Sequence, residues 1–139
     1  MKIVLKDSRR YVLRFDKKEE VFSKLAEFAT GENISAATFS AIGACEEIEL
    51  GYFNTNLKDY RKKPFYEELE MVSLSGNISM AEGKPTVHAH GMFGRTDFSI
   101  LGGHVFKAIV SVTCEMFLIK LDGQMTRKLD EVSNSKLLE

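Results

Sequence analysis

Apolar and polar residues alternate along most of this chain with the two-residue period of β-strands. The alternation is clearest where Ile48, Leu50 and Tyr52 are interleaved with glutamates and a glycine. Similar stretches cover 3–5, 11–15, 65–80, 86–92, 98–101 and 105–119. The second half of 105–119 is rich in β-branched and apolar residues, which predicts a strand covered on both faces. Six to eight strands are expected.

One segment follows the helical period instead. Its apolar positions recur on one face of a 3.6-residue helix and are Val21, Phe22, Leu25, Phe28 and Ala29. Asp16, with Glu19 three residues later, is placed as an N-cap with a capping box, and Gly31 as a natural stop. We therefore predict one main helix over about 17–30.

Short turns are predicted between the remaining elements. Asp122-Gly123 predicts a hairpin that returns as a last strand over 125–129, and 133–139 is expected to be a flexible polar tail. Because the helix comes early and hairpin signals dominate afterwards, the class is α+β with a central, mostly antiparallel sheet. The length fits a single domain over 1–139, with its core at about 10–129.

The composition limits the partners and the compartment that we expect for this protein. The 139 residues carry a net charge of −1, with lysine and arginine dispersed, so no whole-molecule field attracts nucleic acid or an anionic membrane. The chain shows no signal peptide and no apolar run of about 18 residues, so we expect a cytoplasmic protein without a membrane partner. Cys45 and Cys114 lie far apart with no Cys-x-x-Cys spacing and are expected to be small apolar strand residues.

The three histidines form the most specific candidate site. His88 and His90 are two residues apart, which places both rings on one face of a strand, and His104 follows a glycine pair. Neutral imidazole is a common ligand for zinc and other divalent metals, and three of them leave a fourth position for water or a ligand. The alternative is that these histidines only form hydrogen bonds or face solvent.

Several carboxylates could support such a site. Glu67, Glu68 and Glu70 offer a metal ligand or a general base, or simply a solvated strand edge. Glu115 lies inside a hydrophobic run, where an ionised carboxylate needs a partner such as Arg95, Lys107 or a neighbouring subunit. Glu115 and Arg95 are therefore candidates for groups that support the histidines from behind.

Several short motifs occur together in a characteristic order. They are Ala41-Ile42-Gly43-Ala44, the segment 65–78 (FYEELEMVSLSGNI), the strand 85–90, Gly94-Arg95 followed by Gly102-Gly103-His104, and Thr113-Cys114-Glu115. With these motifs the chain resembles the PPC (plant and prokaryote conserved) domain, also called PCC or DUF296, over roughly 10–129. The resemblance implies an α+β fold with a largely antiparallel sheet that assembles as a homotrimer.

The resemblance also implies partners and site residues. Plant members join this domain to AT-hook motifs and bind DNA, but this chain has no Arg-Gly-Arg-Pro core, so direct DNA binding is not expected. The acidic-aromatic segment of plant members contacts partners, which assigns an interaction surface to Tyr66, Glu67, Glu68, Leu69 and Glu70. Prokaryotic members place metal-holding histidines like His88, His90 and His104.

Three functions stay open at this point. The first is a trimeric binding or regulatory module that takes a metal or small ligand at the histidines. The second is a metal-dependent hydrolase, in which metal-bound water attacks and Glu115, Glu67 or Glu68 acts as base. The third is a DNA-associated protein like the plant members. No motif names a reaction, and we expect a binding module rather than an enzyme.

Overall fold

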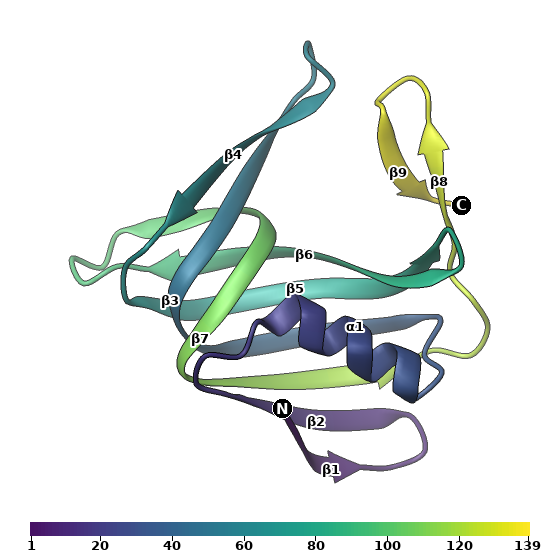
Figure 1. The fold of residues 1–139 in the computed structure, drawn as a ribbon, viewed down its shortest axis with the longest axis horizontal. Helices are drawn as coiled ribbons and strands as arrows, with labels where there is room; N and C mark the ends of the chain where they lie inside the picture. Colours follow the sequence, from purple (N-terminus) through teal and green to yellow (C-terminus); the bar gives the residue numbers. More distant parts are fainter.

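The computed structural model describes residues 1–139 as one antiparallel seven-stranded sheet, a single helix and a separate two-stranded hairpin (Figure 1). The sheet order is β1-β2-β7-β6-β5-β3-β4. The elements are β1 (Lys2–Lys6), β2 (Arg10–Asp16), α1 (Val21–Gly31), β3 (Ala37–Asn54), β4 (Asp59–Phe65), β5 (Leu69–Ala81), β6 (Lys84–Gly94), β7 (Ile100–Lys120), β8 (Arg127–Asp130) and β9 (Ser135–Leu138). The predicted class, α+β with a mostly antiparallel sheet, is confirmed.

Four of the strands form a closed ring of pairings. β3 pairs with β5, β5 with β6, β6 with β7 and β7 again with β3, all antiparallel. β3 and β7 can pair with several neighbours because they are long, with 18 and 21 residues, and because both curve strongly (Figure 1). Pairing around a ring leaves no free edge among these strands, and only β1 and β4 end the sheet.

The core is one cluster of 26 buried residues, to which both the sheet and α1 contribute. The helix buries its apolar face, formed by Val21, Leu25, Phe28 and Ala29. The largest fully buried side chains include Phe15 of β2 and Phe93 of β6. Alternation places every second residue of β2, and of β3 over 37–41, in this core, whereas β1 and β4 bury no residue.

The helix begins later than its sequence signals indicate. Its N-cap is Glu20, whose carboxylate accepts hydrogen bonds from the backbone N–H groups of Phe22 and Ser23. The expected N-cap, Asp16, ends β2, although Glu19 does accept from its backbone N–H at 2.8 Å. The backbone of Lys18 and Glu19 bonds to Val110 of β7, which keeps the chain out of the helix until Glu20.

The C-terminal segment also differs from the prediction. Asp122-Gly123 does not turn the chain back along β7, because Leu121 and Met125 donate their backbone N–H groups to Ala36 and Ser35 instead. The chain therefore crosses the end of the sheet, and β8 pairs with β9 rather than with β7. Residues 135–138 of the expected polar tail form β9.

Two further predictions concern side-chain environment. Cys45 and Cys114 are buried and free, and burial raises the pKa of both thiols to about 12, so both serve as small apolar residues as expected. The prediction that β7 is covered on both faces is wrong for a single copy, since Val112 and Phe117 are 71% and 57% exposed. No helix is long and apolar enough to cross a bilayer.

A substitution at Gly76 tests how closely β5 and β6 approach each other. A Cβ at this position would lie 2.1 Å from the backbone carbonyl oxygen of His88, which cannot move without breaking the strand pair. We expect Gly76→Ala to lower the free energy of unfolding by about 1–3 kcal/mol or more in urea denaturation. Gly31→Ala is the matched control, because nothing lies within 4 Å of its added Cβ and alanine favours a helix. Equal stability of Gly76→Ala and wild type would contradict the close approach of the two strands at this position.

Candidate metal centre

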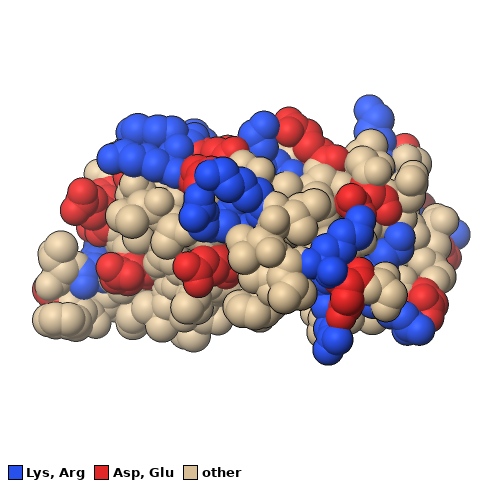
Figure 2. Space-filling view, turned by 90° about the horizontal axis from the view of Figure 1, so that it is seen from below, with Lys and Arg blue, Asp and Glu red and all other residues tan.

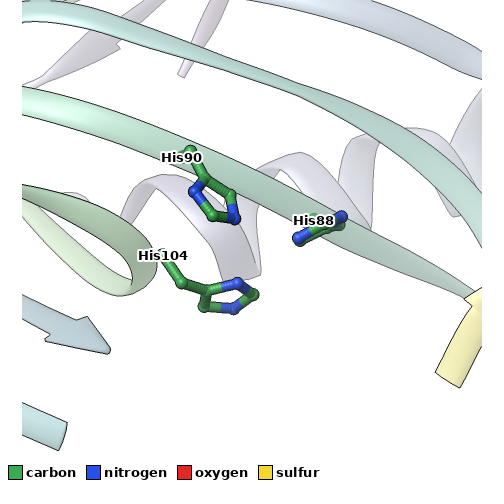
Figure 3. Close-up of side chains that lie close together, drawn as sticks. All are labelled: His88, His90 and His104. Carbon is green, nitrogen blue, oxygen red and sulfur yellow. The ribbon is translucent and has the colours of Figure 1, made fainter. Parts of the chain in front are cut away.

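The three histidines converge from two neighbouring strands. His88 and His90 lie on β6 on either side of the buried Ala89, so their rings leave the sheet on the face away from the core. His104 lies on β7 directly opposite His90 in the antiparallel register. Figure 3 shows the three rings turned toward one another. A spacing of two residues on one strand and one cross-strand neighbour are sufficient to build the cluster.

The geometry of the cluster fits a metal with nitrogen ligands. One ligand nitrogen from each ring lies within 4.8 Å of the others, and the ring centroids are 5.0 to 5.4 Å apart. Nitrogen ligands at about 2.0–2.1 Å around a tetrahedral ion lie roughly 3.4 Å from one another, so the rings need only a small inward rotation. Three imidazoles with no thiolate or carboxylate in the group suit zinc and similar ions, and leave one position open.

The electrostatics of the cluster favour neutral rings. Burial, followed by the neighbouring His88 and His90, lowers the pKa of His104 to about 4. Burial also lowers the pKa of His88, with smaller contributions from Arg127 and His90. Both rings are therefore uncharged at neutral pH, the state in which an imidazole nitrogen has a lone pair for a metal.

Aromatic side chains form one wall of the site. The rings of Tyr60 and Phe106 lie 4.8 and 4.4 Å from the His104 ring, and the Tyr60 hydroxyl is 3.4 Å from its Nδ1. Gly51 of β3 faces His104 in the register, and a Cβ there would lie 2.4 Å from Cε2 of Phe106. The missing side chain at Gly51 is therefore what admits the wall, and with it the orientation of His104.

Arg127 of β8 lies beside His88, whereas the aromatic wall lies beside His104. Its Nη2 donates to Asn77 Oδ1 at 2.9 Å and contacts His88 Nδ1 at 3.1 Å. Its Nε donates to Ser79 Oγ at 2.8 Å, and its Nη1 to the carbonyl of Lys136 at 2.8 Å. Neither Arg127 nor Asn77 was identified as a site residue from the sequence. The available signal was weak: Asn77 lies opposite His88 in the β5–β6 register, but only the crossing of 121–126 brings Arg127 to them.

A cavity of about 780 Å³ opens beside the histidines. Its wall includes His88, His104, Tyr60, Phe106 and Arg127, together with residues of the β8–β9 hairpin. Its charged lining residues are Lys58, Asp59, Arg127 and Lys136. The candidate metal centre therefore has space for a small molecule next to its open side.

The groups expected to support the histidines lie elsewhere. Arg95 pairs with Glu67, with 2.8 Å between Nη2 and Oε1, and lines a second cavity of about 450 Å³ that no histidine reaches. Glu115 is exposed on β7, where it needs no buried partner, and Lys107 pairs with Glu47 instead. The expectation that Glu115 and Arg95 stand behind the histidines is thus not met, and Arg127 and Asn77 occupy that place.

The segment assigned as an interaction surface lies on the rim of this second cavity. Tyr66, Glu68 and Glu70 are exposed and Glu67 is half-buried, whereas Leu69 is buried in the core. Glu68, Leu69 and Glu70 line the second cavity with Arg95. Four of the five side chains therefore reach solvent, and Leu69 serves the fold.

The fold and the cluster define an antiparallel β-domain with a three-histidine centre on its ring of strands. The family model "Plants and Prokaryotes Conserved (PCC) domain" matches residues 4–122. The chain belongs to this PCC (PPC) family. No curated protein matches the sequence.

Three solved structures are similar over nearly the whole chain. A metal-containing protein from Archaeoglobus fulgidus is 37% identical with a TM-score of 0.90, covering 100% of this chain and 99% of that one. A PPC protein from Pyrococcus horikoshii is 32% identical with a TM-score of 0.90, covering 95% and 92%. A provisionally described DNA-binding protein from Bacteroides thetaiotaomicron is 27% identical with a TM-score of 0.93, covering 97% and 94%.

The lowered pKa of His104 predicts how stability depends on pH in the metal-free protein. The unfolded chain takes up a proton near pH 6.5, whereas the folded site resists it until about pH 4. Stability should therefore fall as the pH is lowered from 6.5 to 4, because the unfolded state binds more protons in that window. Thermal melting in the presence of a chelator measures the effect.

The variant His104→Gln separates this contribution from that of the carboxylates. Glutamine at position 104 does not titrate, so the melting temperature of the variant should fall less steeply between pH 6.5 and 4 than that of wild type. Parallel pH profiles for the two proteins would show that His104 is not desolvated in the folded state.

Proposed function

We propose that this domain binds a divalent metal ion, zinc or a similar ion, through His88, His90 and His104, and acts as a metal-dependent binding module for a small ligand. The observation that carries the proposal is the convergence of three imidazoles, with ligand nitrogens within 4.8 Å of one another, beside an open cavity. The metal-containing relative from Archaeoglobus fulgidus supports it. When bound, the metal would supply a Lewis-acidic position for a ligand donor atom.

Other residues around the histidines hold the site in shape and line the path to it. Tyr60 and Phe106 exclude water from one side of His104 and hold its ring. Lys62 covers the Phe106 ring with its ammonium group at 3.8 Å from the centroid, which fixes this wall further. Arg127 contacts His88 Nδ1 in the metal-free site and lines the cavity beside it. A ligand would therefore enter through the cavity, between the aromatic wall and the guanidinium.

Binding is favoured over hydrolysis by the placement of carboxylates. Of the general bases considered for a hydrolase, Glu67 and Glu68 lie at the second cavity region and Glu115 is exposed on β7. The one carboxylate that lines the main cavity is Asp59, whose Oδ1 accepts from the backbone N–H of Tyr60. The expected base for a metal-bound water thus has no counterpart beside the histidines.

A DNA-associated role has support from the provisionally described DNA-binding relative. The charge of this chain argues against direct contact, because the net charge is −1 and Arg61, Lys62 and Lys63 are the densest basic run. On the face seen in Figure 2, basic and acidic side chains are interspersed rather than gathered in one stripe. Salt-dependent retardation of duplex DNA is the measurement that separates this role from ligand binding.

We propose further that residues 1–139 form one domain that assembles as a homotrimer. An apolar patch surrounds the second cavity and consists of Val72, Phe98, Ile100 and Val112, each at least 50% exposed. Glu68, Glu70 and Arg95 line the same cavity, so apolar contacts and ion pairs between copies are available in one place. A further copy would also cover Glu68 and Glu70 of the assigned interaction surface.

His88→Ala tests the metal site. Because three ligands are needed to hold the ion, the variant should lose stoichiometric metal, measured by elemental analysis after purification, while its fold and assembly are kept. Thr86→Ala is the matched control, because it removes a side chain two residues away on the same face of β6 and should keep the metal. Equal metal content in His88→Ala and wild type, or a wild type without metal affinity, would refute the site.

Phe98→Asp tests the assembly. Phe98 is 91% exposed in the β6–β7 turn, so aspartate there should leave the fold intact but place charge in an apolar interface. Light scattering after gel filtration should give about one chain mass for the variant and about three for wild type, from a chain mass of 15.7 kDa. Val132→Asp, an exposed apolar position on the β8–β9 hairpin, is the control that should stay trimeric. A monomeric wild type would contradict the assembly itself.

A further inference from the structure

Arg127 is a half-buried cation with no anionic partner. All four of its polar contacts go to neutral groups: Ser79 Oγ, Asn77 Oδ1, the Lys136 carbonyl and His88 Nδ1. It takes part in none of the 13 ion pairs of the chain. A charge withdrawn from water in this way is costly unless a counter-charge compensates it. The structure thus holds a guanidinium in place at a functional cavity and leaves its charge unbalanced.

The contact between Arg127 and His88 cannot coexist with a metal on His88. A guanidinium only donates, so His88 Nδ1 must present its lone pair to Arg127. If the metal binds Nδ1, that lone pair is used. If the metal binds Nε2, the neutral ring carries its proton on Nδ1, which then faces another donor. Metal loading therefore frees one Nη2 donor of Arg127 whichever nitrogen is the ligand.

The freed donor stays close to the metal centre. Ser79, Asn77 and the Lys136 carbonyl still hold Nε, Nη2 and Nη1, so the guanidinium has no reason to leave the cavity wall. Among the other charged lining residues, Lys136 pairs with Glu82 at 2.6 Å, and Lys58 and Asp59 carry opposite charges. Arg127 is therefore a lining cation without an anionic partner, and a divalent metal at the histidines would add to its positive charge, so the loaded site would attract an anionic ligand.

We propose that Arg127 is the anion-binding residue of this site, and that the ligand is a small organic carboxylate that binds the metal's open position and the freed guanidinium edge together. The inference rests on the proposed metal site and adds the chemical class of its ligand. A carboxylate presents two oxygens, one for the metal and one for the guanidinium edge, and unlike inorganic phosphate it carries a non-polar part. The aromatic wall of Tyr60 and Phe106 faces the non-polar part of such a ligand.

Cobalt(II) provides the test, because its visible absorption reports a change of ligand at the open position. Wild type and Arg127→Gln are loaded with Co²⁺ and titrated with acetate, and in a second series with inorganic phosphate. Wild type should bind acetate at least as tightly as phosphate. Arg127→Gln should still bind one equivalent of Co²⁺ but bind acetate about tenfold or more weakly, as loss of a charge-assisted hydrogen bond predicts.

Two controls keep the outcomes distinct. Lys128→Gln removes the neighbouring exposed cation, which pairs with Glu139, and should leave acetate binding unchanged. Arg127→Lys retains charge without the planar fork and should give an intermediate affinity, and it replaces Arg127→Gln if that variant does not fold.

Each result decides something. Absence of Co²⁺ binding by wild type would overturn the metal site and this inference with it. Normal Co²⁺ binding with equal acetate affinity in wild type and Arg127→Gln would overturn only the role of Arg127. Phosphate binding ten times tighter than acetate would overturn the carboxylate assignment. Loss of Co²⁺ from folded Arg127→Gln would show that Arg127 positions His88 rather than binding an anion.

Discussion

The antiparallel pairing that places His90 of β6 and Gly51 of β3 on either side of His104 is the constraint on which the site depends. It exists only because β7 pairs with β6 at its start and with β3 along most of its length, which closes the ring of strands. A register shift of one residue would move His104 to the opposite face. The geometry of the centre is therefore a property of the whole sheet rather than of a local loop.

The same closure explains why the site is both rigid and partly dry. The ring fixes the backbone on two strands, and Tyr60 and Phe106 cover His104 from the side that Gly51 leaves free. Half-burial then lowers the pKa of His88 and of His104, since a charged ring there would lose hydration without gaining an anion. The neutral state of these two rings, which a metal would require, is thus set by packing as much as by the identity of the residues.

Much of this arrangement could be predicted from the sequence. The two-residue period identified the strands and put His88 and His90 on one face, and the helical period identified α1, because both patterns are local. The helix start was placed too early, since the bonds of Lys18 and Glu19 to Val110 are long-range and override the capping signal at Asp16. Glu115 was given a role because its neighbours are apolar, yet its side chain points out of an uncovered face of β7.

Arg127 shows where sequence reasoning ends. An arginine in a polar C-terminal segment carries no signal of its own, and its contacts with Asn77, Ser79 and His88 join residues 39 to 50 positions apart. They arise because 121–126 bonds to Ser35 and Ala36 and carries the chain across the sheet. Such a contact follows from the path of the backbone, which periodicity does not encode.

The β8–β9 hairpin lies beyond residue 122, where the match to the family model ends. The three imidazoles lie on strands within the matched residues, whereas the guanidinium that contacts His88 comes from the hairpin beyond them. Under the proposed function, the metal ligands and the anion-binding residue would therefore come from separate segments of the chain. A change in the hairpin could then alter the choice of small ligand while the three histidines stay in place.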